Sequence, residues 1–488
     1  MRRSGRRSVA ALALVAVSIA AGCADRSGLR ATGSHPGFRG PIVVISLAAL
    51  GAGSVGGEAG VTPRLDRFVA ESTWSGTGVA AASWSTGSLA SVWTGVPPSV
   101  HGVGHPAHPW LRRDVPTLAE ALAGAGFATC AFYASPWSGP RSGLERGFDA
   151  SRPLHRAGPD RWLAGLPEGP SLTWIELPLP GPDPTAEQAA DAAARQDPAA
   201  TRQTDAAVRQ EAGSAASAPV PPFGDRLVNG DRRLGRLLDA LGRSGRDAEA
   251  IVIVLGDHGE ARQDGETVPA GLDLTRDSVA VPLAIRLPDA LRPRLRAPAG
   301  ATVGLDRVPA TLLELAGVRP SPSMAPSLLR PSAWAALSEV WFANGYHEIG
   351  LYEDGHQLRW RCRFAAADPG FDAAWREALG PDGGLRYGEL VARLQADFRA
   401  RPECVGGEEL TLEAWPADGG GLPVHDDALR DRMIERLRTL RHFPPVWSVA
   451  PAPPRPALRR REFGALAGWG LPLPAQWLAT GRAGGSPG

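Results

Sequence analysis

A carboxylate and an imidazole stand side by side directly after an apolar run in this sequence. Residues 251–255 read "IVIVL", and Asp257 and His258 follow them in "GDHGE". A short, continuous apolar run is typical of a buried strand, so both side chains are expected at a strand tip. Carboxylate and imidazole groups are common metal ligands, which makes this pair a candidate metal site. Two structural alternatives remain open, in which Asp257 caps the following turn and His258 only forms a hydrogen bond within the fold.

A second pattern suggests phosphate chemistry but lacks the element that such chemistry needs. Gly51, Gly53 and Gly56 form G-x-G-x-x-G directly after an apolar run at residues 41–50. A dinucleotide site requires this turn to open a helix, whose N-terminus binds the pyrophosphate. Two more glycines and a proline follow, so the next helix is predicted to begin only at about residue 63. We therefore expect no nucleotide site here.

Composition restricts the class of protein and of mechanism. The 488 residues suit one large domain with appendages, and the 52 basic and 51 acidic residues give a net charge of +1. A nucleic-acid-binding protein needs a basic excess on one face, so no nucleic-acid partner is expected. The chain contains no lysine, which excludes any mechanism that requires a lysine side chain.

The N-terminus has the pattern of a targeting segment. "MRRSGRR" is a basic region, and the apolar stretch after it is too short to predict a membrane span. The stretch ends in "IAAGC", which resembles a bacterial lipoprotein signal with Cys23 as the lipidated first residue of the mature chain. An ordinary signal peptide cleaved nearby is the alternative. In both cases we expect an exported protein of the bacterial cell envelope, and with lipidation at Cys23 a membrane anchor.

Strand-like and helix-like segments alternate through the first two thirds of the chain. Apolar runs at 41–50, 171–177 and 281–288 predict buried strands, and segments such as 226–245 have apolar residues at helical spacing. This alternation predicts an α/β fold with a central, mostly parallel sheet flanked by helices.

The domain organisation follows from changes in composition. Cysteine use fits an exported chain: Cys130 is expected to be a buried thiol, and Cys362 and Cys404 could form a disulfide, although sequence does not establish the pair. The predicted segments are a signal peptide at 1–22, a tether at 23–40, the main domain at 41–325 with a flexible insertion at 183–222, a smaller α+β C-terminal subdomain at 326–445, and a tail rich in Pro, Arg and Trp at 446–488.

Six blocks in a fixed order resemble the sulfatase family of the alkaline-phosphatase superfamily. They include "PIVVISLAAL", "SWSTGSLASVWTGVPPSVHGV", "AIVIVLGDHGE" and "VPATLLELAGVRP", and the resemblance covers roughly residues 41–320. It implies the alkaline-phosphatase-like sulfatase fold and hydrolysis of sulfate or phosphate esters. It also implies a divalent cation of the calcium or magnesium class, bound at the strand tips.

Several residues depart from the pattern of that family. The resemblance makes Asp257 and His258 metal ligands and places Ser85 at the nucleophile position, but the aspartates expected after the first strand are Ala48 and Ala49. Because a hard cation prefers around six oxygen ligands, the two remaining ligands should bind it weakly. The loss of several groups that stabilise the transition state should leave little activity, since one such donor contributes about 10²–10³ in rate.

Two functional hypotheses follow from this mixture of retained and lost residues. The first is a sulfatase-fold envelope lipoprotein that is a pseudoenzyme, needs no metal, and keeps its scaffold for binding or assembly. The alternative is an active sulfuric-ester or phosphoric-ester hydrolase with Ser85 as nucleophile and a rearranged cation site at Asp257 and His258. In that case Asp225 or Asp231 would have to complete the metal shell.

Overall fold

The computed structural model describes residues 37–441 with several gaps, the longest at 180–222 and 364–407. The predicted signal peptide with Cys23, the insertion at 183–222, Cys404 and the tail at 446–488 therefore lie outside the described residues. Within the described part of the chain, no helix combines the length and the apolar character needed to cross a bilayer.

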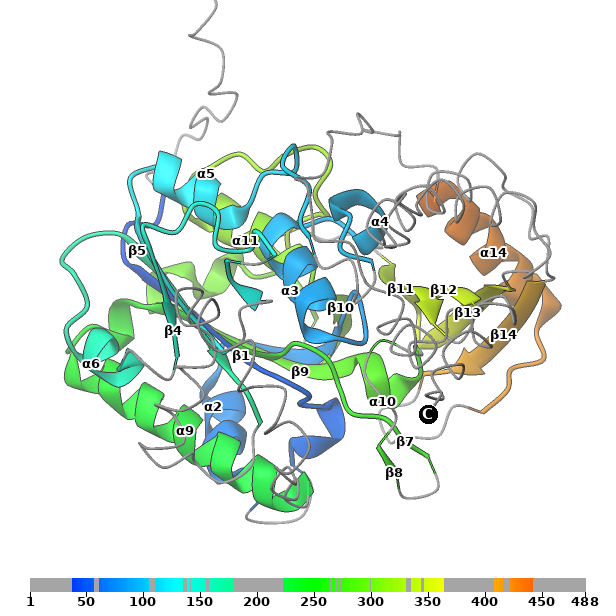
Figure 1. Ribbon diagram of the computed structural model, residues 1–488, viewed down its shortest axis with the longest axis horizontal. Coiled ribbons are helices and arrows are strands. Elements are labelled where there is room, and N and C mark those ends of the chain that lie inside the picture. Colours follow the sequence, from blue (N-terminus) through cyan, green and yellow to red (C-terminus); the bar gives the residue numbers. More distant parts are fainter. Residues whose placement is uncertain are drawn as a thin grey trace, which may run out of the picture.

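An eight-stranded sheet forms the centre of the main domain (Figure 1). The strand order is β10-β2-β9-β6-β1-β5-β3-β4, and only β9 runs antiparallel to its neighbours. The strands are β1 (Pro41–Leu47), β2 (Trp74–Val79), β3 (Ala128–Tyr133), β4 (Ala150–Pro153), β5 (Ser171–Leu177), β6 (Ile251–Gly256), β9 (Ala280–Arg286) and β10 (Thr302–Gly304). This mostly parallel sheet confirms the fold class predicted from the alternating segments.

Helices cover both faces of this sheet, as Figure 1 shows. On one face lie α3 (Ser85–Thr94), α5 (Leu118–Gly124) and α11 (Arg307–Leu315), and their apolar residues share a core with Val44 of β1. On the other face α2 (Pro63–Glu71), α6 (Pro159–Ala164) and α9 (Phe223–Arg243) pack against Val43 and Ile45. Successive side chains of a strand point to opposite faces, so the continuous apolar run of β1 supplies both cores.

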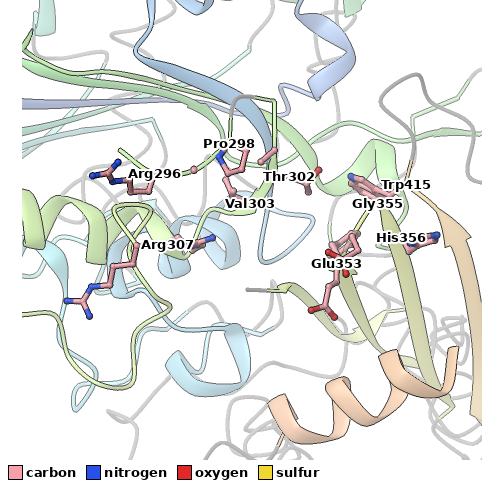
Figure 2. Close-up of a pocket in the computed structure, with 14 residues that line it drawn as sticks. Arg296, Pro298, Thr302, Val303, Arg307, Glu353, Gly355, His356 and Trp415 are labelled. Carbon is pink, nitrogen blue, oxygen red and sulfur yellow. The ribbon is translucent and has the colours of Figure 1, made fainter. Parts of the chain in front are cut away.

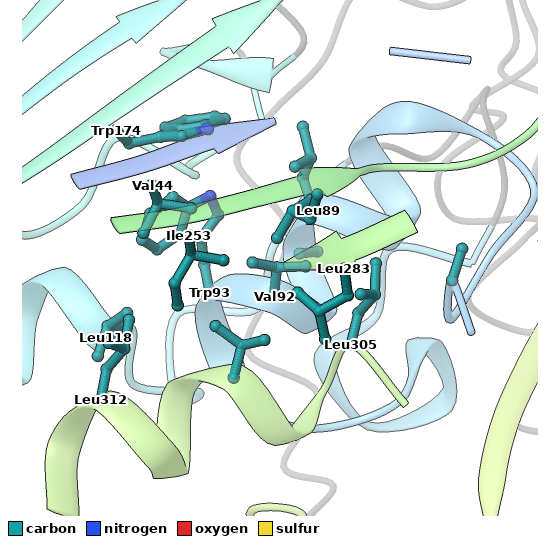
Figure 3. Packing of buried hydrophobic residues seen from close by; sticks show 14 of the residues in the cluster. Val44, Leu89, Val92, Trp93, Leu118, Trp174, Ile253, Leu283, Leu305 and Leu312 are labelled. Carbon is teal, nitrogen blue, oxygen red and sulfur yellow. The ribbon is translucent and has the colours of Figure 1, made fainter. Parts of the chain in front are cut away.

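The core beneath α3 fixes the position of that helix relative to the central strands. Trp93 is fully buried and its ring lies 4.9 Å from that of Trp174 on β5. Leu89 and Val92 of α3 belong to the same cluster, which Figure 3 shows beside Ile253. Helix α3 ends at Gly95, whose φ of 70° is the left-handed conformation that glycine adopts without steric cost. The first turn of α3 is thereby held over the ends of β1 and β6.

A separate antiparallel sheet follows the main domain and confirms the predicted α+β character of the C-terminal region. Its order is β11-β12-β13-β14, and one face shares a core with α14 (Asp427–Arg441). Cys362 of this sheet is disulfide-bonded, and Cys130 of the main domain is a free, buried thiol. The strands are β11 (Ala336–Ala343), β12 (Tyr346–Glu353), β13 (His356–Arg363) and β14 (Glu408–Ala414).

The two sheets are joined through the first strand of the smaller one. The Glu339 amide of β11 donates to the Ala81 carbonyl over 2.8 Å, and its carboxylate accepts from the Ser99 amide over 2.7 Å. Ser99 lies in α4 (Pro98–His101), close to the end of α3. The remaining described elements are short: α10 (Arg276–Val279), the hairpin of β7 (Arg262–Gln263) and β8 (Glu266–Thr267), and the 3-10 helices η1 (Ala52–Ser54), η4 (Asp247–Glu249) and η5 (Asp289–Arg294).

A cavity of about 260 Å³ lies where the two sheets meet, between the segment before β10 and the β12–β13 turn (Figure 2). Its arginines include Arg307 and Arg330. Arg307 donates to the Pro326 and Ser327 carbonyls, and Arg330 pairs with Glu314 at 2.6 Å. The lining does not include Ser85, Asp257 or His258. This cavity is therefore separate from the residues that the sequence singles out.

Candidate functional site

The tips of β1 and β6 meet at the point where the sequence places its candidate residues. The two strands pair in parallel with Leu47 opposite Gly256, so the next residues, Ala48 and Asp257, also lie side by side. The Asp257 amide continues the pairing by donating to the Leu47 carbonyl over 3.1 Å. Parallel pairing thus places the alanines of the first tip directly against the carboxylate of the second.

The Asp257 carboxylate is fully buried, and only one of its two oxygens accepts hydrogen bonds. Its Oδ1 accepts hydrogen bonds from the Ala49 amide at 3.1 Å and from the His258 amide at 2.7 Å. Its Oδ2 is buried and has no hydrogen-bond partner among the described residues. An unpaired buried acceptor typically costs about 1–3 kcal/mol, so Oδ2 could accept one further hydrogen bond. Ala49 reaches Oδ1 with a φ of 56°, an unusual conformation for alanine.

The His258 ring connects this tip to helix α3. Its Nδ1 lies 2.7 Å from the Gly259 carbonyl, and its Nε2 lies 3.2 Å from the Ser85 hydroxyl. A carbonyl oxygen can only accept, so Nδ1 carries the proton and, in the neutral ring, Nε2 accepts from Ser85. The ring is 6% exposed, and Asp257 Oδ1 lies 3.8 Å from Nε2. The structure therefore brings Ser85, Asp257 and His258 together.

Ser85 is the first residue of α3, and backbone geometry presents its side chain at the helix N-terminus. Trp84 before it is extended, with φ −154° and ψ 151°, and its side chain makes no capping hydrogen bond. The amides of the first helical turn have no intrahelical acceptor and point toward the space in front of the helix. Gly87 is required because a Cβ there would lie 2.6 Å from the Trp84 indole nitrogen.

Two close contacts hold the loop after Asp257 in place. The Gly259 amide donates to the Ser278 carbonyl over 2.8 Å, and a Cβ at Gly259 would lie 1.9 Å from the Asp277 carbonyl oxygen. Glu260 accepts from Arg226 of α9 through both carboxylate oxygens, at 2.6 and 2.7 Å. Glu260 is therefore engaged in an ion pair with the helix below.

The residues present do not fit a divalent cation. No group of three or more His, Cys, Asp or Glu among the described residues is arranged to bind a metal ion. Asp257 offers one unpaired oxygen, whereas both nitrogens of His258 already have partners. Asp231 instead accepts from the Arg64 and Leu65 amides at the start of α2, and Asp225 is exposed on α9. Neither acid completes the shell that a rearranged cation site would need.

Sequence reasoning missed one buried acid on a neighbouring strand. Glu176 of β5 is 2% exposed and accepts from the Ala134 amide at 2.8 Å and from the Ser138 hydroxyl. It pairs in register with Ser46, two residues before Ala48. A carboxylate inside the otherwise apolar "SLTWIEL" was the available signal. Its Oε2 accepts both hydrogen bonds and so holds Ala134 and Ser138 after β3.

Comparisons with known proteins bear on the fold that carries these residues. Residues 180–318 match the family model described as Sulfatase. The match covers less than half of the chain, so it shows a likeness to sulfatases over this segment. No curated protein sequence matches the chain significantly, so relationships beyond that model come from structures.

Solved structures share the sulfatase fold over most of the chain at low identity. A protein solved in complex with its substrate, D-glucosamine-2-N,6-O-disulfate, is 14% identical with a TM-score of 0.55, covering 83% of this chain and 99% of the other. A phosphonate monoester hydrolase from Silicibacter pomeroyi is 15% identical at a TM-score of 0.52, covering 83% and 95%. An alkaline-phosphatase-superfamily protein from Vibrio parahaemolyticus is 17% identical at 0.51, covering 86% and 90%. Sulfatases and related proteins typically use a divalent metal. The described residues at these strand tips, in contrast, include no group of three or more side chains that could bind one.

Proposed function

We propose that this protein is a sulfatase-fold envelope lipoprotein that has lost metal-dependent ester hydrolysis and retains the scaffold for binding or assembly. One observation carries the proposal. At the tip of β1, the group that faces the Asp257 carboxylate is the backbone amide of Ala49, at 3.1 Å, in place of a second carboxylate. Because alanine side chains offer no oxygen, the tip supplies one half of a cation shell and no more.

The alternative, a metal-dependent hydrolase with a rearranged site, makes the opposite prediction in a direct assay. Metal-dependent turnover needs a bound cation to polarise the ester. We expect purified protein supplied with Ca²⁺ or Mg²⁺ to hydrolyse neither p-nitrophenyl sulfate nor p-nitrophenyl phosphate above the rate of an Asp257→Ala variant. Calorimetric titration with either ion should give no saturable heat. Turnover that requires added metal and disappears in Asp257→Ala would overturn the proposal.

The anchor is testable separately from the chemistry. The lipoprotein-like pattern "IAAGC" places the modified sulfur at Cys23. Full-length protein expressed in a bacterial host with labelled palmitate should incorporate the label and sediment with membranes. A Cys23→Ser variant should lose the label, whereas Cys130→Ser, which removes the buried thiol, should keep it. Equal labelling of the Cys23→Ser variant and the wild type would rule out this anchor.

A further inference from the structure

The hydrogen bond between Ser85 and His258 is not used by the binding or assembly role proposed above. We propose that this pair is a metal-independent serine–histidine dyad that hydrolyses small, uncharged carboxylic esters. The proposal goes beyond the loss of metal chemistry stated above, because it assigns an acyl-transfer activity to the residues that remain.

The tautomer of His258 is the first step of the argument. Its Nδ1–H is fixed on the Gly259 carbonyl at 2.7 Å, which leaves the Nε2 lone pair facing the Ser85 hydroxyl at 3.2 Å. This is the relation between a nucleophile and its general base, with the base oriented by a third group. Here a backbone carbonyl provides the orientation, and Asp257 Oδ1, 3.8 Å from Nε2, provides negative charge beside the ring.

The start of α3 supplies groups that can stabilise an oxyanion. Ser85 is the first residue of a ten-residue helix, and no side chain caps that helix at Trp84. The amides of Thr86 and Gly87 therefore have no intrahelical acceptor, and the helix dipole adds positive potential where they point. Backbone N–H groups arranged before the reaction are the usual donors to a tetrahedral oxyanion.

Electrostatics favour an uncharged acyl ester over a sulfate or phosphate. No arginine among the described residues donates a hydrogen bond to Ser85, Asp257 or His258. The buried Asp257 carboxylate would repel an anionic ester, whose reaction requires cationic groups around the transferred group. The transition state of acyl transfer develops one negative charge, which a few N–H donors can stabilise. Ser85 itself is only partly exposed, which favours a small substrate over a bulky one.

The reaction balances with water as the only co-reactant. Ser85 Oγ forms a bond to the ester carbonyl carbon while its proton moves to His258 Nε2, and the π electrons move to the carbonyl oxygen. Collapse of this intermediate breaks the bond to the alkoxy oxygen, which takes the proton from His258 and leaves as an alcohol. Water then attacks acyl-Ser85, gives a proton to His258, and releases the carboxylic acid after His258 returns the proton to Ser85.

The experiment uses full-length protein in excess EDTA, with p-nitrophenyl butyrate as substrate and a fluorophosphonate reporter as covalent probe. We expect ester hydrolysis without metal and one reporter bound per chain, at Ser85 by peptide mapping. Ser85→Ala should lose both signals. His258→Gln should lower the hydrolysis rate by about 10²–10⁴, the usual contribution of a general base. Ser244→Ala, which removes a hydroxyl that bonds the Leu241 carbonyl on α9, should match the wild type.

Each outcome separates this proposal from the one it extends. Wild-type hydrolysis no faster than that of Ser85→Ala, or a reporter bound equally well to Ser85→Ala, would overturn the dyad and leave the loss of metal chemistry standing. Sulfate-ester turnover that requires Ca²⁺ or Mg²⁺ would overturn the loss of metal chemistry instead. Thermal unfolding of every variant shows whether a lost signal reflects chemistry or folding. Peptide mapping of the reporter in the wild type needs no variant, and labelling at any residue other than Ser85 would also overturn the dyad.

Discussion

Replacing Asp306 by asparagine is expected to stabilise the protein strongly at pH 8 and hardly at all at pH 4. Asp306 precedes α11, is 5% exposed, and its Oδ1 is buried without a hydrogen-bond partner. Burial raises the pKa of this carboxyl from 3.8 to about 7, and the neighbouring Arg307 guanidinium only partly opposes the rise. Arg307 donates instead to the Pro326 and Ser327 carbonyls.

The direction of the pH dependence follows from the raised pKa. Below about pH 3 the carboxyl is protonated in both states, so the fold keeps its full stability. As the pH rises from about 4 to about 7, the Asp306 carboxyl ionises in the unfolded chain but stays protonated in the folded protein. The equilibrium constant for folding therefore falls about tenfold for each pH unit. Asparagine has the same shape and no charge. At pH 8 the equilibrium constant for folding of the Asp306→Asn variant should therefore exceed that of the wild type by on the order of a thousandfold.

Urea unfolding of both proteins between pH 4 and 8 measures this difference. His101 is a useful comparison, because burial lowers the pKa of its ring from 6.5 to about 3. Its charged form is favoured in the unfolded chain, so its effect has the opposite sign: stability is lost as the pH falls below 6.5. His101→Gln should therefore lessen the acid sensitivity of the protein.

An Asp306→Asn effect that is the same at every pH would show that the native carboxyl is ionised.

Replacing Gly259 by alanine is expected to disrupt the site and destabilise the fold together. The new Cβ would lie 1.9 Å from the Asp277 carbonyl oxygen, a backbone atom that cannot rotate away. Overpacking of this kind typically costs about 1–3 kcal/mol. The Gly259 carbonyl also holds His258 Nδ1, so its displacement should free the ring from Ser85 and slow fluorophosphonate labelling.

Gly53→Ala is the matched control for this substitution. Gly53 lies after the tip of β1, and a Cβ there would have no atom within 4 Å. The control should retain the unfolding midpoint and the labelling rate of the wild type. If Gly259→Ala behaved in the same way as Gly53→Ala, the contact with Asp277 would not constrain the loop, and His258 would not depend on it for orientation.

The sequence predicted the fold well because its main signals are local. The apolar runs that become β1 and β6 and the amphipathic pattern of α9 lie where expected, and the helix after the glycine-rich turn begins at Pro63. The antiparallel direction of β9 between β6 and β2 was not predicted, because strand direction depends on pairing between distant segments.

The candidate site was predictable as a set of residues but not as a network. The resemblance to sulfatases brought Ser85, Asp257 and His258 into one place, and the structure places them in contact. Sequence could not reveal that the Gly259 carbonyl fixes the tautomer of His258, or that the Ala49 amide binds Asp257 Oδ1. Both are backbone contacts, which depend on φ and ψ and leave no side-chain signature. For the same reason Asp231 could not be assigned from sequence to the start of α2.

The pairing of β1 has a consequence for the order in which the protein folds. β1 ends at Leu47, but its partners are β5, which begins at Ser171, and β6, which begins at Ile251. A ribosome releases the chain from its N-terminus, so β1 emerges before both of its partners, and its pairing with β6 must wait until about half of the 488 residues have been made. Such long-range pairing is slow and leaves strand edges open to aggregation. A nascent chain that ends before Ile251 should therefore depend on a chaperone, and Ser85 should acquire its histidine partner only in the late steps of folding.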